Sequence, residues 1–236
     1  MVHRRDSQVT RRVVRDIQAS TAGAAIGPIT PGCEIFGVNK GQFSLVDIIA
    51  WCLDATGPAD VAVSTWTAAN ADLGFAYRML GDGRIKSLRF VVDFSFPTRQ
   101  PEYAAALRER FGAGAIRVTK THAKFVTIRN DQWNIVIRSS MNLNENRRLE
   151  TFEVSDDVGM ADFLDSLIDE LWAGQPEGNG MTQKPYDTCK EFEGLFGGEA
   201  VAVDEAAVMA STDARKYFGN GRYDVDIRRA GRTATG

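Results

Sequence analysis

The sequence predicts an α/β fold in which helices flank a mixed β-sheet. From residue 60 to residue 119, apolar β-branched stretches alternate with amphipathic ones, which is typical of strands joined by helices. Two strands within 123–138 then follow one another with only the turn ArgAsnAspGln between them, and this composition is typical of a hairpin. Because a hairpin adds antiparallel pairing to the alternating pattern, we expect a sandwich built on a mixed sheet.

The first firm element is a helix that begins after Ser44. Ser44 and Asp47 resemble a capping box, apolar residues recur at helical spacing, and Gly57-Pro58 ends the pattern. Farther along, Pro101 opens another helix as a first-turn proline. The other expected elements are strand 60–67, helix 68–80, strand 85–94, helix 101–111, strand 115–119, strands 123–128 and 133–138, strand 151–154 and helix 161–172.

Three regions are expected along the chain. Residues 1–25 have the composition of a basic N-terminal arm, with five arginines and a stretch of small residues. Residues 26–174 contain the strand and helix signals and form the predicted domain. Residues 175–236 begin with a Gly/Pro/Asn-rich linker and continue as an extension of unassigned role, with short helices expected at 187–196 and 200–209.

The composition is that of a globular protein with an ordinary core, 44% hydrophobic and 25% charged over 236 residues. No apolar run reaches the roughly 18–20 residues of a membrane-spanning helix, and the Arg-rich start has no signal-peptide core, so we expect no membrane partner. The three cysteines are far apart and form no CxxC pair, which favours reduced thiols and a cytoplasmic location. With only two histidines, we expect no zinc site.

Charge is distributed unevenly. Residues 107–148 contain nine Lys or Arg against three Asp or Glu, whereas residues 149–213 contain sixteen acidic residues and two lysines. A basic centre favours a polyanionic partner, although acidic helices also commonly present a solvated face.

The stretch from Thr121 to Glu153 holds the residues best suited to chemistry. His122 and Lys124 are two apart on a predicted strand, so both side chains emerge from one face of the sheet. The hairpin returns the chain so that Ser140 and Asn142 leave the neighbouring strand near His122. A histidine, a lysine, a hydroxyl and an amide form a suitable set for a phosphate group.

This segment resembles the phospholipase D superfamily, whose signature is HxK, a GSxN-like turn and a closing Glu. HisAlaLys at 122–124 matches HxK, SerSerMetAsn at 139–142 matches GSxN with Ser139 in place of Gly, and Glu153 follows Asn142 by eleven residues. Arg129 stands where the family has an Asp, and the spacing from His122 to Asn142 is longer than in the common lipase form. Both departures are similar to the His-Lys-Asn branch, which includes DNA-repair phosphodiesterases and a metal-independent restriction endonuclease. The resemblance covers roughly residues 36–173.

The resemblance implies a phospholipase D-like sandwich and a set of site residues. His122 would be the nucleophile that forms a phosphohistidine, Lys124 and Asn142 would stabilise the phosphate oxygens, and Glu153 would orient the imidazole, with Glu150 as a rival for that role. The implied substrate-binding residues are Ser140, Arg147 and Arg148. No metal or other cofactor is implied, because lysines supply the positive charge.

One histidine cannot be nucleophile and general acid in the same step. The only other histidine is His3 in the predicted arm, so we expect a homodimer that brings two copies of His122 together.

The basic stretch favours nucleic acid as the substrate, with DNA preferred over RNA. Two alternatives stay open: a phospholipase or phosphatidyl transferase, and an inactive module that binds nucleic acid or a protein on the same fold. Trp66 and Asn70 follow the first predicted strand and either line the same cleft or belong to the core.

Overall fold

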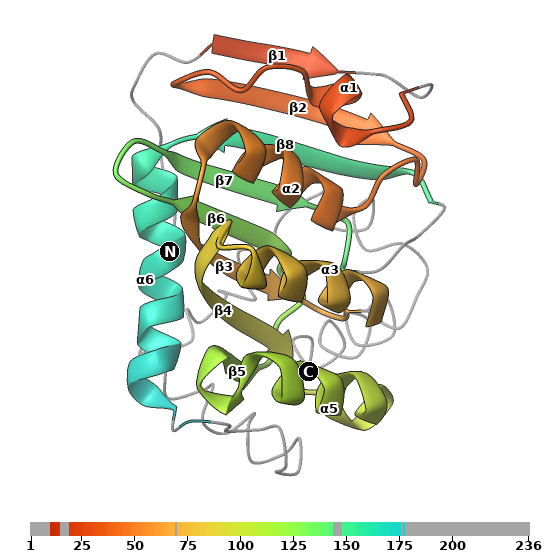
Figure 1. The fold of residues 1–236 in the computed structure, drawn as a ribbon, viewed down its shortest axis with the longest axis vertical. Coiled ribbons are helices and arrows are strands. Elements are labelled where there is room, and N and C mark those ends of the chain that lie inside the picture. Colours follow the sequence, from red (N-terminus) through yellow and green to blue (C-terminus); the bar gives the residue numbers. More distant parts are fainter. Residues whose placement is uncertain (1–9, 15–18, 69, 144–147, 176, 178–236) are drawn as a thin grey trace, which may run out of the picture. The chain divides into compact units, whose positions relative to one another are not determined.

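The chain folds around an eight-stranded mixed β-sheet with helices on both faces (Figure 1). The computed structural model describes residues 10–14, 19–68, 70–143, 148–175 and 177. The strands are β1 (Thr10–Val14), β2 (Cys33–Asn39), β3 (Ala59–Thr65), β4 (Ile85–Asp93), β5 (Ile116–Thr119), β6 (Phe125–Arg129), β7 (Asn134–Ser139) and β8 (Glu150–Asp156). The helices are α1 (Ala22–Ile26), α2 (Leu45–Thr56), α3 (Asn70–Gly81), α4 (Phe96–Arg99), α5 (Pro101–Phe111) and α6 (Val158–Gly174), with a 3-10 turn at Ala113–Ala115. The predicted α/β fold with a mixed sheet is confirmed.

The strand order is β1-β2-β8-β7-β6-β3-β4-β5. Strands β3, β4 and β5 run parallel, as the helical connections between them require. Strand β6 is antiparallel to β3, and β6, β7, β8 and β2 pair antiparallel in turn. The sheet therefore has a parallel part, β3-β4-β5, and an antiparallel part, β6-β7-β8-β2, which meet between β3 and β6, and β1 is added in parallel at the outer side of β2.

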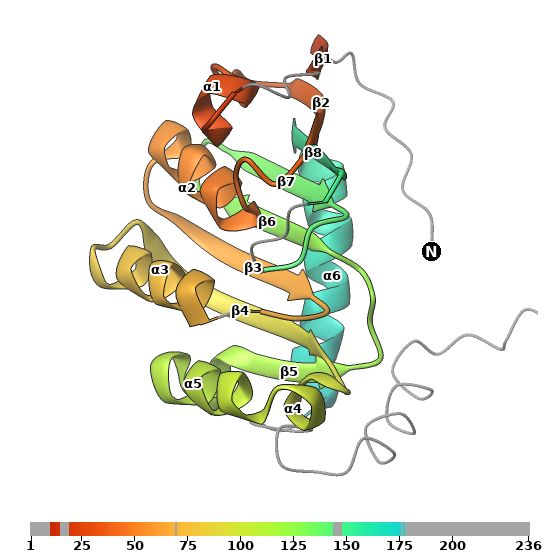
Figure 2. The ribbon, with the colours of Figure 1, turned by 90° about the vertical axis from the view of Figure 1, so that its right-hand side faces the viewer.

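Two layers of helices cover the sheet. Helices α2, α3 and α5 lie on one face and α6 lies on the other (Figure 2). The main core includes Ile48 of α2 together with Val126 and Ile128 of β6, all fully buried. A smaller cluster joins Val136 of β7 to Ala161 and Leu164 of α6. No helix among the described residues is long and apolar enough to cross a bilayer.

Several helix boundaries follow the predicted signals. The Ser44 hydroxyl accepts from the Asp47 N–H and the Asp47 carboxylate accepts from the Ser44 N–H, so the capping box is formed. Helix α5 begins at Pro101 and ends at Gly112, whose φ of 78° lies in the left-handed region that favours glycine.

The N-terminal region differs from the prediction. Part of the predicted arm, 10–14, forms strand β1, which pairs in parallel with β2, and both strands precede the helix expected to be the first element. Strand β2 has the burial pattern of a half-buried strand, but its alternation contains a glycine and an asparagine, which weaken a strand signal. Strand β1 is rich in arginine, and it forms because its backbone pairs with the backbone of β2. The expected helices at 187–196 and 200–209 lie outside the described residues.

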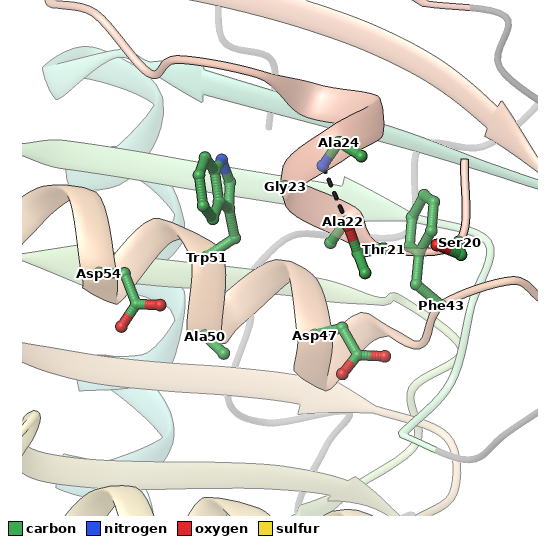
Figure 3. A pocket seen from close by; sticks show the side chains of 10 residues that line it. All are labelled: Ser20, Thr21, Ala22, Gly23, Ala24, Phe43, Asp47, Ala50, Trp51 and Asp54. Carbon is green, nitrogen blue, oxygen red and sulfur yellow. Dashed lines mark hydrogen bonds between the residues drawn. The ribbon is translucent and has the colours of Figure 1, made fainter.

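The small residues near the start are explained by the packing of α1 on α2. A hollow lies between these two helices, with Trp51 beside Gly23 (Figure 3). A Cβ atom on Gly23 would lie 2.7 Å from the Trp51 ring, so no larger residue fits without displacing the indole. Trp51 also donates from Nε1 to the Gly27 carbonyl at 2.9 Å.

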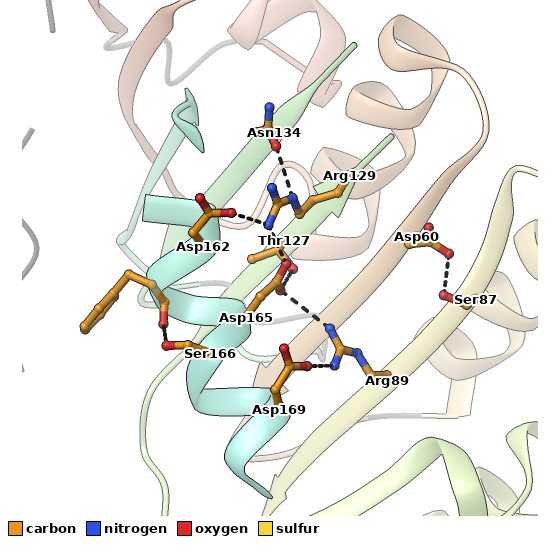
Figure 4. A network of polar contacts seen from close by, with 11 residues as sticks. Asp60, Ser87, Arg89, Thr127, Arg129, Asn134, Asp162, Asp165, Ser166 and Asp169 are labelled. Carbon is orange, nitrogen blue, oxygen red and sulfur yellow. Dashed lines mark hydrogen bonds and ion pairs between the residues drawn. The ribbon is translucent and has the colours of Figure 1, made fainter. Parts of the chain in front are cut away.

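Helix α6 is attached to the sheet by a network of ion pairs (Figure 4). Arg129 of β6 pairs with Asp162 at 2.8 Å and with Asp165 at 3.1 Å. Arg89 of β4 pairs with Asp169 at 2.5 Å and lies 3.7 Å from Asp165. The position that carries an Asp in the phospholipase D signature is therefore occupied here by an arginine that holds a helix.

Candidate active site

Four of the predicted site residues, His122, Lys124, Ser140 and Asn142, lie at one edge of the sheet, before β6 and after β7. The parallel strands β3 and β4 end there, at Thr65 and Asp93, and the edge lies at their arrowheads in Figure 1. Because β6 is antiparallel to β3, its first residue, Phe125, lies opposite Ser64 at the same edge. Strand β7 ends there as well, at Ser139. In open α/β sheets, ligands bind outside the carboxyl ends of the strands where the direction of the connections changes.

His122 and Lys124 lie next to each other at this edge, just before β6. The Lys124 ammonium nitrogen is 3.1 Å from His122 Nδ1 and 3.4 Å from Nε2, and it donates to the His122 carbonyl at 2.8 Å. His122 is exposed and Lys124 is half-buried. A ligand at the imidazole would therefore also meet the ammonium group, as the resemblance implies.

The segment that carries His122 is held by buried polar groups at the strand ends. The Asp93 carboxylate accepts from the Thr121 N–H at 3.2 Å, and the Ser64 hydroxyl donates to the Ala123 carbonyl at 3.0 Å. Asp93 and Ser64 are 5% and 1% exposed, so their positions are fixed by the packed sheet. His122 thus lies on a short loop that is tied to β3 and β4 on either side of it.

The turn 139–142 continues the hairpin as predicted. The Ser139 N–H donates to the Lys124 carbonyl at 3.2 Å, which extends the ladder between β6 and β7. The Ser140 hydroxyl accepts from the Thr151 N–H at 2.9 Å and donates to the Glu150 carboxylate. The buried Asn142 Oδ1 has no hydrogen-bond partner in the described structure. Buried polar atoms usually have partners, so this amide is a group that a ligand would complete.

The two candidate carboxylates lie in different surroundings. Glu153 faces Arg138 across the β7–β8 pair and forms an ion pair with it. Its neighbours Phe152 and Val154 belong to the main core, so alternation along the strand places Glu153 on the opposite face, toward α6. Lys124 precedes Val126 of the main core by two residues, so its side chain is on the same face as Val126, away from α6. The structure therefore brings Glu150, bonded to Ser140, to the site, and it pairs Glu153 with Arg138 instead of the imidazole.

Burial lowers the pKa of Lys124 below its ordinary value of 10.5, and the nearby Glu150 carboxylate partly offsets this by raising it. The ammonium group is desolvated at the edge of the sheet, and Glu150 is the acidic side chain that affects it. Of the two predicted phosphate-binding arginines, Arg148 is exposed and Arg147 lies outside the described residues.

Trp66 and Arg99 complete the surroundings of His122. The Trp66 ring centroid is 5.4 Å from that of His122, and the Arg99 guanidinium carbon lies 3.9 Å above the Trp66 ring. Trp66 is half-buried, so of its two predicted placements it takes the one beside the site. Arg99 was not among the predicted site residues: it is the last residue of α4, a helix of only four residues whose sequence signal is too short to recognise.

Among the described residues, no group of three or more His, Cys, Asp or Glu side chains is arranged to hold a metal ion. Cys33 in β2 and Cys52 in α2 are buried free thiols. Burial raises the pKa of both.

Comparison with known proteins finds similarity in solved structures. No protein-family profile and no curated protein sequence matches the chain. The fold is similar to a polyphosphate kinase from Porphyromonas gingivalis, with 16% identity and a TM-score of 0.45 over 62% of this chain and 27% of that one. It is also similar to Nuc from Salmonella typhimurium, described as a phospholipase D family member, with 14% identity and a TM-score of 0.44 over 61% of this chain and 96% of that one. The chain thus spans about a quarter of the length of the kinase.

Proposed function

We propose that the protein is a metal-independent phosphodiesterase of the phospholipase D type that cleaves DNA through a phosphohistidine on His122. The observation that carries the proposal is the Lys124 ammonium group, 3.1 Å from His122 Nδ1, at the sheet edge where ligands bind. The exposed imidazole is open to a phosphodiester, and the ammonium is placed to bind its non-bridging oxygens.

In the proposed reaction, an imidazole nitrogen of His122 attacks phosphorus as the bond to the leaving oxygen breaks. The leaving oxygen takes a proton from His122 of a second subunit. Water then attacks the phosphohistidine, the nitrogen–phosphorus bond breaks, and the water proton passes to the second histidine. Both imidazoles return to their starting states, so the two steps balance without a metal.

Ser140, Asn142 and Glu150 support this reaction in the proposal. The unpartnered Asn142 Oδ1 is a hydrogen-bond acceptor, so it is available to a donor such as a protonated phosphate oxygen. Glu150 holds the Ser140 hydroxyl and balances the charge of Lys124. DNA as the substrate, the homodimer and the cytoplasmic location rest on the sequence and stay predictions.

The direct test is incubation of the purified protein with plasmid and single-stranded DNA in EDTA. We expect wild-type protein to cleave and His122→Ala to lose at least about a thousandfold in rate, as removal of a nucleophile does. A phosphohistidine trapped by denaturation at alkaline pH, where the nitrogen–phosphorus bond survives, should be found with the wild type alone. A requirement for magnesium would contradict the proposal, and DNA binding without cleavage or trapped intermediate would identify an inactive binding module instead.

A further inference from the structure

Arg99, the last residue of α4, forms no ion pair with a carboxylate of the described residues, in contrast to several arginines in and beside β4, β6 and β7. Arg84, Arg89, Arg129 and Arg138 each pair with an aspartate or a glutamate. Within the described part of the chain, Arg99 contacts only the Trp66 ring, the Trp66 carbonyl and the Ser95 hydroxyl. Its positive charge, which is exposed at the rim of the site, is paired with no carboxylate of the described residues.

The guanidinium is nevertheless held in place. Its Nε donates to the Ser95 hydroxyl at 2.9 Å and one terminal nitrogen reaches the Trp66 carbonyl at 3.4 Å. Ser95 is in turn fixed by the buried Asp93, which accepts from the Ser95 N–H at 3.0 Å and from its hydroxyl. An arginine ordered in this way loses little conformational entropy when it binds a ligand.

The Asp93 carboxylate also positions the loop that carries His122. One Asp93 oxygen accepts from Ser95, below Arg99, and the other accepts from the Thr121 N–H, next to His122. The Trp66 ring contacts both the Arg99 guanidinium and the His122 imidazole. Arg99 and His122 are therefore held by common supports, with a single indole beside both.

A guanidinium that stacks by its face keeps donors at its edge, and such an edge matches the oxygens of a phosphate group. A small phosphodiester has one phosphate, which His122 and Lys124 would bind. A nucleic-acid strand has further phosphates on either side of it. We propose that Arg99, stacked on Trp66, is a specificity residue that binds a phosphate flanking the scissile one. This rests on the proposed function and deepens it, because it makes the substrate a strand and not an isolated diester.

The test compares two substrates with the full-length protein. Arg99→Gln should lose at least fivefold more kcat/KM on a single-stranded 12-nucleotide DNA than on bis(p-nitrophenyl) phosphate, mainly through KM. Arg99→Lys keeps the charge without the planar fork and should fall between wild type and Arg99→Gln. Arg108→Gln, which removes the same charge from an exposed position on α5, should match wild type on both substrates. Equal losses on the two substrates, or no loss with DNA, would overturn the proposal.

A binding measurement separates this proposal from the proposed function. In the His122→Ala background, fluorescence anisotropy of the same labelled oligonucleotide needs no turnover. Arg99→Gln should weaken binding severalfold and reduce the slope of log K against log salt by about 0.7, the value for one phosphate contact on a single strand. If wild type cleaves nothing but this change is seen, the proposed catalysis fails and the subsite stands. If binding and slope are unchanged while circular dichroism shows a folded protein, the subsite is wrong.

Discussion

Lys124 lies between an imidazole and a carboxylate, and this position determines how the site responds to pH. Burial lowers the pKa of Lys124, and the negative charge of Glu150 raises it again in part. The ammonium form is the one that would bind a phosphate oxygen, so activity should fall as the pH rises through this lowered pKa. The alkaline limb of the rate profile should therefore lie below the ordinary lysine value of 10.5.

Glu150→Gln should move the alkaline limb of the kcat/KM profile to lower pH, because removal of the carboxylate charge lowers the pKa of Lys124 further. Glu153→Gln is the matched control, since Glu153 pairs with Arg138 on the other face of the sheet. Glu153→Gln should leave the alkaline limb of the kcat/KM profile at the wild-type pH. A shift with Glu153→Gln and none with Glu150→Gln would show that the spacing of the family motif, and not the observed contact, identifies the functional carboxylate.

For individual site residues, the structure agrees best with the prediction where the residues are close together in the sequence. His122 and Lys124 are two residues apart, and the hairpin brings the turn with Ser140 back to the same end of the sheet. The prediction that a strand carries His122 and Lys124 is wrong, because both lie in the loop before β6. The choice between Glu150 and Glu153 depends on how β8 enters the sheet after the segment 144–147, and no local pattern determines that register. Arg99 reaches the site only through the order of β3 and β4, which is a long-range property.

Among the elements, the pairing of β2 with β8 leaves no room for a side chain at Gly37. A Cβ atom there would lie 2.1 Å from Phe152 Cζ, and Phe152 is 1% exposed, so the ring has nowhere to move. These two residues are direct partners in the antiparallel register. The glycine is required by the close approach of an aromatic ring and not by its own backbone angles.

Gly37→Ala should lower the free energy of unfolding by about 1–3 kcal/mol, the usual cost of overpacking a buried site. Urea unfolding followed by circular dichroism would measure it. Gly81→Ala is the control, because no atom lies within 4 Å of a Cβ built there. In a Phe152→Leu background the cost of Gly37→Ala should shrink, since the ring is gone. An undiminished cost would assign the effect to the backbone instead.

Strand β1 shows why part of the fold could not be predicted from the sequence. The central helices and strands were predicted because their caps and periodicity are written in consecutive residues, as with Ser44 and Pro101. Strand β1 has no such signal, because its arginines resemble those of a solvated arm. It becomes a strand through the backbone bonds that β2 offers, which is a tertiary effect that overrides propensity.

For the whole molecule, the basic stretch 107–148 is partly used for folding. Arg117 is 6% exposed and donates to backbone carbonyls, while Arg129 and Arg138 pair with acidic residues of α6 and β8. The charge asymmetry of the sequence therefore overstates the charge available to a polyanion. Among the described residues, positive charge beside His122 comes from Lys124, which Glu150 partly balances, and from Arg99, which lies outside the stretch.

The proposed homodimer makes a quantitative prediction. If each active unit needs His122 from two subunits, co-expression of wild type with an equal amount of His122→Ala should halve the activity per wild-type subunit, to about 50%, because mixed dimers are inactive. Co-expression with Gly81→Ala should leave it unchanged. Sedimentation velocity should find a dimer. Full activity in the mixture, or a monomer that still cleaves DNA, would contradict the shared site.

The double role of Asp93 has an evolutionary consequence. Since a single carboxylate anchors both the loop bearing the imidazole and the turn bearing the stacked guanidinium, substrate preference and turnover are not independently adjustable here. Directed-evolution libraries that vary residues 94–99 to obtain new substrates should recover variants whose chemistry has changed as well. Divergent descendants of this protein would then alter the surroundings of Arg99 and of His122 together.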